Sequence, residues 1–244
     1  IADELVDGAA AQAHTDPAAA LDAYEQTILA APQRRLHTDP IVHAYAITAR
    51  RCGFHREYLA AFFNSMRADL TQREYSPSEL QDYIYGSAEA IGLLCLQIFL
   101  AEEDVSPADR AAMERGARAL GSAFQKINFL RDLGEDSSTL GRTYFQQAPS
   151  GRIDEATKSA LIAEIRQELA TAALTIDVLP ASARVGVSAA ADIFAELTNR
   201  LAATPATALA TTRVSVPNHT KAWLAARAVR RRGHSNQTPP LAGD

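Results

Sequence analysis

The strongest constraint on the fold is a helix-start signal that recurs along the chain. Asp16-Pro17 and Asp39-Pro40 each place a capping carboxylate before a proline at the first helical position. Ser76-Pro77-Ser78-Glu79 adds the glutamate of a full capping box, and Ser106-Pro107-Ala108-Asp109 repeats the arrangement. These starts predict a chain built from helices.

Long Ala- and Leu-rich segments lie between the predicted starts. Thr212–Val216 alternates briefly like a strand, but Pro217 follows it, so we expect an extended linker there. The sequence therefore predicts an all-α protein, with one helical domain over residues 1–232 and a flexible C-terminal tail over residues 233–244. The expected helices are Ala18–Ala31, Ile41–Cys52, Arg56–Leu70, Leu80–Leu100, Arg110–Asp136, Ile153–Val178, Ala183–Leu201 and Thr220–Arg232.

Composition narrows the classes of function. With 244 residues, 47% of them hydrophobic, the chain is long enough for one large core. A formal net charge of −5 gives no indication of nucleic-acid binding. No apolar run is long enough for a membrane span, although composition leaves a peripheral membrane contact open. Cys52 and Cys95 lack a metal-ligand spacing, so we expect buried thiols in a reducing, cytoplasmic compartment.

Residues 125–145 carry an unusual polar stripe. Asn128, Asp132 and Asp136 follow one another at i, i+4 and i+8, so they stack on one face of a helix. Gln125 lies one turn earlier, and Arg131 lies beside them. Carboxylate and amide oxygens suit a hard cation such as Mg²⁺. A solvated helix face is the alternative for a stripe of this kind.

A second acidic pair stands at the start of the chain. Asp3 and Asp7 have the same spacing as Asp132 and Asp136. If the two pairs face each other across a helical cavity, they would hold several divalent ions and bind a diphosphate. The metal would then act as a Lewis acid while the diphosphate leaves an allylic carbon. Pairs that point outward and apart would refute this interpretation.

Five segments of the chain resemble one known family. In this chain, IADELVDG and QKINFLRDLGEDSSTLGRTYF resemble the first and second Asp-rich motifs of the squalene/phytoene synthase family. Two stretches between these motifs, FFNSMRADL and LQDYIYGSAEAIGLLCL, resemble the family's intermediate segments. Near the C-terminus, TRVSVPNHTKAWLAARA resembles the end of the family's actinobacterial phytoene synthases. The resemblance covers most of residues 1–232. Because the chain begins at Ile1, already inside an acidic motif, we expect a natural N-terminal part to precede it.

This resemblance implies an isoprenoid-synthase-type helical bundle around a central cavity. It also implies a head-to-head (1′–1) prenyl transferase of carotenoid biosynthesis, which condenses two molecules of geranylgeranyl diphosphate to phytoene through prephytoene diphosphate and releases inorganic diphosphate. Mg²⁺ or Mn²⁺ would be required, and NADPH would not. The resemblance implies five metal ligands, which are Asp3, Asp7, Asn128, Asp132 and Asp136. The four aspartates among them are also the implied catalytic residues.

The resemblance also implies where the substrate binds. Tyr83 matches a position that family members use near the substrate, and YIYGSAEAIG is expected to line a prenyl tunnel, with tight helix packing as the alternative. Glu89 departs from the family's common form and would be awkward in an apolar tunnel. Arg131 and Arg142 suit diphosphate oxygens because a guanidinium group makes paired, charge-assisted bonds. The other expected substrate-binding residues are Gln125 and Asn128, with Arg67 and Asp69 as secondary candidates.

Two rival functions stay open at this point. The first applies the same chemistry to C15 farnesyl diphosphate and makes squalene, which needs NADPH, or dehydrosqualene. Chain length depends on the side chain that closes the tunnel floor, and sequence spacing does not reveal it. The second is a non-catalytic helical assembly protein of the same superfamily. The presence of both acidic pairs argues against it, because a buried carboxylate is costly without a metal.

Overall fold

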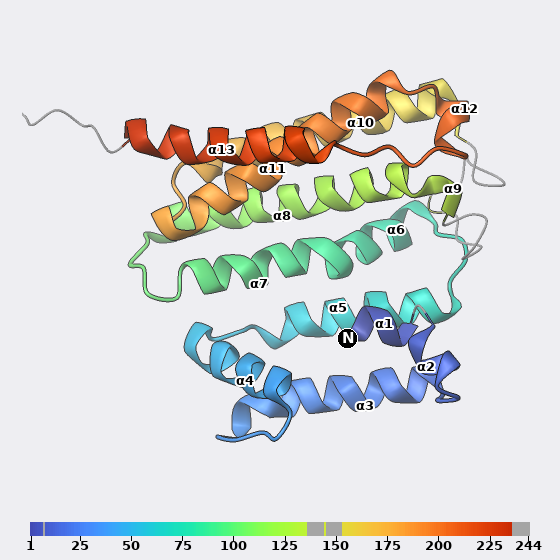
Figure 1. The fold of residues 1–244 in the computed structure, drawn as a ribbon. Coiled ribbons are helices and arrows are strands. Elements are labelled where there is room, and N and C mark those ends of the chain that lie inside the picture. The colour runs from blue at the N-terminus through green and yellow to red at the C-terminus, as the bar shows by residue number, and fades with distance from the viewer. Residues whose placement is uncertain (7, 136–143, 145–152, 236–244) are drawn as a thin grey trace, which may run out of the picture.

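Figure 1 shows the chain as layers of helices in a computed structural model that describes residues 1–6, 8–135, 144 and 153–235. Within these ranges the structure contains no strand, so the predicted all-α class is confirmed. The elements are α1 (Ala2–Val6), α2 (Ala9–Gln12), α3 (Pro17–Ala30), the 3₁₀ turn η1 (Ala31–Gln33), α4 (Pro40–Cys52), α5 (Arg56–Thr71), α6 (Pro77–Ile84), the π-helical turn η2 (Tyr85–Glu89), α7 (Ala90–Phe99), α8 (Pro107–Arg131), α9 (Leu133–Glu135), α10 (Glu155–Ile176), α11 (Ala181–Ala203), α12 (Ala206–Leu209) and α13 (Asn218–Ser235).

The predicted helix starts are confirmed by their capping bonds. The Asp39 carboxylate accepts from the backbone N–H of Ile41 at 2.8 Å, at the start of α4. Ser76 and Glu79 form both bonds of the capping box that begins α6. In both cases the proline stands at a position whose N–H would have no partner inside the helix. Local sequence chemistry therefore fixes where these helices begin.

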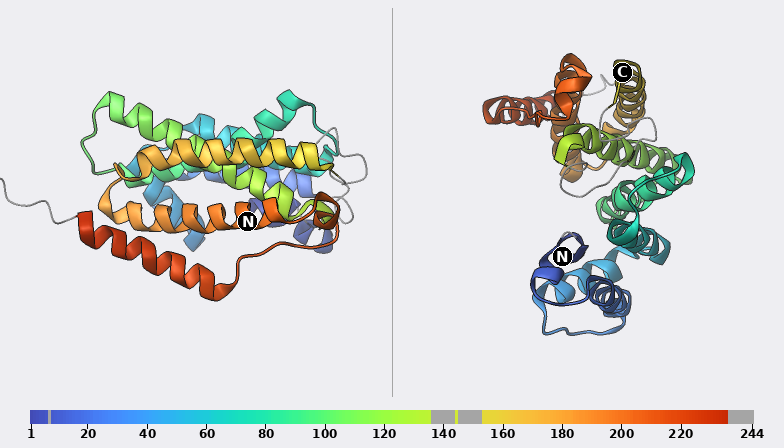
Figure 2. Two further views of the ribbon diagram at one scale, coloured as in Figure 1. Left: turned by 90° about the horizontal axis from the view of Figure 1, so that it is seen from above. Right: turned by 90° about the vertical axis from the view of Figure 1, so that its right-hand side faces the viewer.

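Helix α8 runs through the middle of the molecule. It packs against α7 and η2 on one side and against α10 and α11 on the other. Helices α1 to α5 form a separate layer, and α6, η2 and α7 stand between that layer and α8, as the end view in Figure 2 shows. Helix α13 packs on α11 at the far side. Because α7 and α8 run in opposite directions, the start of α6 and the end of α8 lie at the same end of the bundle.

Two of the three hydrophobic cores among the described residues hold most of these layers together. The first joins α6, α8, α10, α11 and α12, and its fully buried residues include Ile127, Leu130 and Leu201. The second lies among α1, α3, α4 and α5 around Leu21 and Phe63. Each buried side chain of this size contributes about 1.5–3 kcal/mol by leaving water. The first core fixes the end of α8 at which the polar stripe lies.

The expected helix Leu80–Leu100 contains a π-helical turn, which the sequence pattern did not predict. At this turn Gly86 lies so close to α5 that a Cβ atom would be 2.1 Å from the carbonyl oxygen of Ala61. The carbonyl oxygen of Tyr83 accepts from the hydroxyls of Ser65 at 3.0 Å and Ser87 at 2.7 Å. The bond from Ser65 links α5 to the end of α6, directly before this turn.

Two smaller expectations have mixed outcomes. Residues 212–217 have no regular secondary structure, as the linker prediction requires. Cys52 and Cys95 are both free thiols, but Cys95 is exposed, so the expectation that it is buried is wrong. Cys95 lies in the wall of a cavity described below, which explains its contact with solvent space. In the described part of the chain, none of the helices has the length and apolar character that crossing a membrane requires.

Candidate active site

An amide, a carboxylate and two guanidinium groups lie at the C-terminal end of α8, and one of the guanidinium groups comes from another segment. The Oδ1 atom of Asn128 is buried and has no hydrogen-bond partner among the described residues. The Asp132 side chain is 17% exposed and accepts from Arg131 Nε at 3.0 Å. Arg213, from the linker that precedes α13, places its Nε 3.0 Å from the same carboxylate. Opposite charges meet here at a partly buried position, where water screens them less than at the surface.

Helix α8 ends at Arg131, five residues earlier than the pattern predicts. Asp132 has left the helical conformation, with φ −101° and ψ 10°, although its N–H still bonds the Asn128 carbonyl at 2.9 Å. Leu133 is buried, and a Cβ atom on Gly134 would be 2.3 Å from the carbonyl oxygen of Ala210. The helix therefore stops because the chain turns here to pack against the segment after α12. The expectation of one unbroken helix through Asp136 is wrong at this point.

The structure places some of the other expected site residues and leaves the rest outside the described ranges. Asp3 lies exposed on α1, and Gln125 is half-buried on α8. Arg67 forms ion pairs with Asp22 and Glu25 of α3, so it serves as a link between α5 and α3. The expected residues outside the described ranges are Asp7, Asp136 and Arg142.

Tyr83 lies in a buried aromatic cluster next to this end of α8. Its hydroxyl donates to Asp69 Oδ1 at 2.9 Å, and both side chains are almost completely buried. The ring of Phe129, from α8, stacks on Tyr144 at 4.0 Å and lies 6.1 Å from the Tyr83 ring. Burial raises the pKa of Tyr83, as do the neighbouring Tyr144 and Asp69. Tyr83 therefore stays a neutral donor, and Asp69 is the inward-pointing residue of the pair Arg67 and Asp69.

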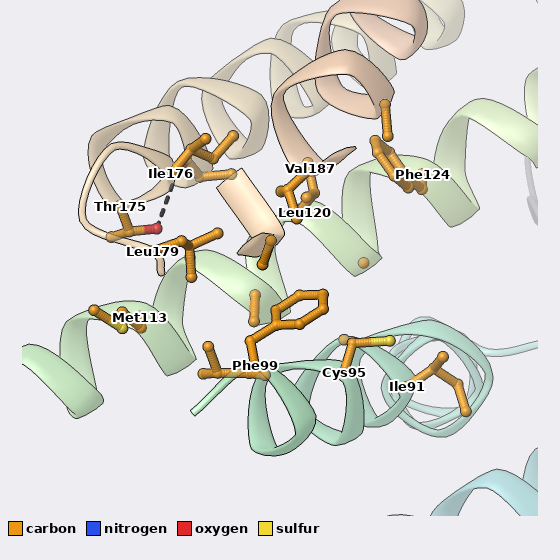
Figure 3. A pocket seen from close by; sticks show the side chains of 18 of the residues that line it. Ile91, Cys95, Phe99, Met113, Leu120, Phe124, Thr175, Ile176, Leu179 and Val187 are labelled. Atoms are coloured by element: carbon orange, nitrogen blue, oxygen red, sulfur yellow. Dashed lines mark hydrogen bonds between the residues drawn. The ribbon is translucent and has the colours of Figure 1, made fainter. Parts of the chain in front are cut away.

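An apolar cavity of about 570 Å³ lies between η2, α7, α8, α10 and α11. Figure 3 shows the side chains that project into it from these helices, among them Phe99, Leu120, Phe124, Ile176, Leu179 and Val187. The hydroxyl of Thr175 donates to the carbonyl oxygen of Ala172 at 3.0 Å, so it does not need a ligand as its partner. A cavity of this size and character suits a largely apolar ligand. We refer to it below as the apolar cavity.

One face of α8 connects the apolar cavity with the polar end. Gly121 and Phe124 line the cavity. Asn128 and Asp132 follow Phe124 at successive steps of four residues, so all four positions lie on the same side of the helix. A ligand along this face would meet carbon first and then the unpartnered Asn128 oxygen and the Asp132 carboxylate. Because the guanidinium groups of Arg131 and Arg213 lie against that carboxylate, the arrangement fits an amphiphile with a long apolar chain and an anionic head group that these cations would bind.

Glu89 does not obstruct the apolar cavity. Ser87, Ala88, Ile91 and Gly92 of the same segment line it, which agrees with the expected tunnel wall. Glu89 instead accepts from Arg118 Nε of α8 at 2.7 Å, and its side chain is 12% exposed. The π-helical turn shifts the positions that face α8 by comparison with a regular helix. The departure from the family's common form is thus accommodated by a salt bridge to α8.

The sequence pattern missed the residues that close the far end of the apolar cavity. Leu96, Leu100, Met113 and Leu179 form a small buried cluster there, and Phe99 projects beside it. Apolar residues at helical spacing indicate a core in general, so their spacing carried no signal that distinguishes a cavity floor from ordinary packing.

The oxygen atoms of Asn128 and Asp132 at the polar end are donors that suit Mg²⁺. Over residues 1–6, 8–135, 144 and 153–235, no group of three His, Cys, Asp or Glu side chains is placed to hold a metal ion. Two of the five expected ligands lie outside these residues, so the metal site stays a prediction. The buried, unpartnered oxygen of Asn128 is the feature that favours it, because a buried acceptor without a partner costs about 1–3 kcal/mol.

Comparison with known proteins supports the fold and the family. A squalene/phytoene synthase family model matches residues 1–220. Phytoene synthase 3 of Zea mays is 38% identical over 149 residues, which cover 59% of this chain and 33% of that protein. The 4,4′-diapophytoene synthase of Staphylococcus haemolyticus is 33% identical over 111 residues, covering 45% of this chain and 36% of that protein. The chain thus spans about a third of the length of the curated relatives it matches.

Solved structures share the same fold at low sequence identity. A dehydrosqualene synthase matches with a TM-score of 0.75 and 19% identity, covering 96% of this chain and 83% of that one. A squalene synthase from Alicyclobacillus acidocaldarius matches with a TM-score of 0.61 and 20% identity, covering 96% of this chain and 81% of that one. The predicted isoprenoid-synthase-type fold is therefore confirmed.

Proposed function

This chain belongs to the squalene/phytoene synthase family, and we propose that it acts as a head-to-head (1′–1) prenyl transferase that condenses two molecules of geranylgeranyl diphosphate to phytoene. The observation that carries the proposal is the shared face of α8, which leads from the apolar cavity to Asn128 and Asp132. A prenyl diphosphate has the matching division into an apolar chain and an anionic head.

The polar end supplies the groups that the diphosphate needs. Arg131 and Arg213 bind its oxygens, together with Arg142 from outside the described ranges, because guanidinium groups make paired, charge-assisted bonds. Gln125 lies one turn before Asn128 and completes this set of polar groups. Bound Mg²⁺ would supply Lewis-acid assistance to the departing diphosphate. The proposed ligands are Asp3, Asp7, Asn128, Asp132 and Asp136.

The aromatic cluster provides an environment for the allylic cation. The rings of Tyr83, Phe129 and Tyr144 are buried against one another next to the polar end of α8, and in this proposal their π faces stabilise the positive charge of the cation. Asp69 holds the Tyr83 hydroxyl at 2.9 Å and so fixes the orientation of that ring. In the proposed sequence, the cation from the first substrate is attacked by the double bond of the second. Loss of one proton to the released diphosphate closes the cyclopropane ring of prephytoene diphosphate. That intermediate then releases its own diphosphate, rearranges and loses a second proton to give phytoene, without NADPH.

The length of the apolar cavity favours a C20 chain. Phe124 and Met113, which line it, are ~17 Å apart along α8 at 1.5 Å per residue, and Asn128 lies ~6 Å further. With C–C bonds of ~1.5 Å that advance roughly 1.25 Å each, an extended geranylgeranyl chain spans ~19 Å and a farnesyl chain ~14 Å. A geranylgeranyl chain that starts near Asn128 therefore ends ~4 Å before the level of Met113, less than one helical turn, whereas a farnesyl chain ends ~9 Å before it, more than one and a half turns.

The rival substrate is C15 farnesyl diphosphate. It is favoured by the similarity to a diapophytoene synthase and by the shared fold with a dehydrosqualene synthase. The reaction chemistry is the same, so only the accepted chain length separates the two proposals.

A product assay tests both proposals. The purified protein is incubated with Mg²⁺ and labelled geranylgeranyl or farnesyl diphosphate, with and without NADPH, and the extracted hydrocarbon is chromatographed. We expect phytoene from the C20 substrate, independent of NADPH and lost in Asp132→Ala. A C30 hydrocarbon as the main product would keep the reaction and replace the substrate. If the folded protein yields no hydrocarbon from either substrate, the non-catalytic assembly role replaces the enzyme.

A further inference from the structure

Phe99 separates two pockets of different chemistry. Its side chain lines the apolar cavity and also a second pocket of about 280 Å³. Ser182 and Ala183 of α11 are the other residues that line both pockets. The second pocket is lined in addition by Arg51, Glu102 and Glu103, so we call it the charged pocket. The partition between the two is thin, because one aromatic ring and two small residues form it.

The partition lies at the end of the apolar cavity that is far from the polar site. Phe99 belongs to the last turn of α7, whereas Ser87 at the start of the cavity wall lies ~18 Å away along the same helical segment. The buried cluster of Leu96, Leu100, Met113 and Leu179 surrounds this end. In Figure 3 the Phe99 ring projects from α7 into the cavity, toward α11.

We propose that Phe99 limits the length of the prenyl chain that the apolar cavity accepts, by closing its far end against the charged pocket. The inference rests on the proposed prenyl transferase function. A chain one isoprene unit longer than C20 would have to displace the Phe99 ring and place carbon beside Arg51, Glu102 and Glu103. Those charged groups are stable in water and gain nothing from apolar contact.

Gly186 offers a change in the opposite direction. It lies on α11 one turn beyond Ala183 and lines the apolar cavity. A Cβ atom built on Gly186 meets no heavy atom within 4 Å, so a side chain there has room to extend into the cavity. Gly186→Leu should therefore shorten the usable length in front of Phe99 without disturbing the helix, because leucine has a higher helix propensity than glycine.

The test is a competition assay with the protein, Mg²⁺ and equal amounts of labelled C15, C20 and C25 prenyl diphosphates. Phe99→Ala should raise the use of the C25 substrate relative to the C20 substrate by about 10-fold or more, the smallest discrimination expected for a change in a hydrophobic pocket. Gly186→Leu should shift preference from C20 toward C15. Ile98→Ala is the matched control, since Ile98 lines only the charged pocket and its replacement should leave the ratios unchanged.

The outcomes separate this inference from the proposed function. If the unmodified protein forms hydrocarbon but Phe99→Ala and Gly186→Leu keep its chain-length ratios, Phe99 does not limit the chain and the inference is wrong. The same conclusion follows if Ile98→Ala changes the ratios as much as Phe99→Ala. Should Phe99→Ala fail to fold, the Gly186→Leu ratio still decides. An unmodified, folded protein that forms no hydrocarbon would overturn the inference together with the function on which it rests.

Discussion

Among the glycines that the structure describes, Gly86 is the one where an added methyl group would come closest to a backbone atom. Its Cβ would be 2.1 Å from the carbonyl oxygen of Ala61 and 2.3 Å from Ser65 Oγ. The first of these atoms is backbone, so relief requires that α5 and η2 move apart by more than 1 Å, relative to an ordinary contact of ~3.5 Å. Such overpacking reaches the upper end of the usual range, and we expect Gly86→Ala to lower the free energy of unfolding by about 3 kcal/mol.

Gly186→Ala is the matched control, because it adds the same group to a helix where nothing lies within 4 Å. There the substitution should raise the free energy of unfolding by about 0.5–1 kcal/mol, through helix propensity alone. The two variants should therefore differ by about 4 kcal/mol, close to a thousandfold in the folding equilibrium constant.

Urea unfolding followed by circular dichroism measures this difference. Both variants should keep the slope of the transition while their midpoints move in opposite directions. If Gly86→Ala is as stable as the unmodified protein, the packing of η2 against α5 is not as close as the structure shows. The explanation of the π-helical turn by that close approach would then be wrong.

Three further predictions concern single side chains. Lys158 is buried and donates to the carbonyl oxygen of Thr204 at 2.6 Å. Lys158→Met should therefore lower the free energy of unfolding in urea by about 2–3 kcal/mol, whereas Lys221→Met, at an exposed position, should leave it almost unchanged. Hydrogen bonds from Ser76 lower the pKa of Glu79. The stability that this cap contributes is present above the ordinary pKa of ~4.3 and is lost as the pH falls through the lowered pKa. Glu79→Gln should therefore remove that part of the pH dependence of the free energy of unfolding, measured by unfolding titrations in acid. Asn128→Ala should raise the Mg²⁺ concentration needed for half-maximal product formation, and an unchanged Mg²⁺ dependence would exclude Asn128 as a ligand.

Helix positions were predictable because their signals are local. The residues Asp39 and Ser76 cap helices through bonds to N–H groups two and three positions ahead, so the sequence contains the whole interaction. The π-helical turn at Tyr85–Glu89 was not predictable in this way. It depends on Ala61 and Ser65, which α5 brings to Gly86 from a distant part of the chain.

The candidate site was predictable in part for the same reason. Asn128 and Asp132 lie on one face as their spacing predicts, since both belong to one helix and its cap. The end of α8 at Arg131 and the approach of Arg213 depend on how the segment after α12 packs. The cavity floor at Phe99 likewise depends on α11, and nothing in the spacing of α7 distinguishes it from a core residue.

The π-helical turn has a consequence for insertions and deletions. A π turn amounts to one additional residue in an α-helix, and each residue rotates the helix by about 100°. Deletion of one residue within η2 would restore the regular helix and advance every later residue of α7 by one place. Phe99 would then occupy the position of Ile98, toward the charged pocket, and Leu100 would replace it at the cavity. Which residues line the cavity thus depends on the number of residues in η2 as well as on the side chains of α7.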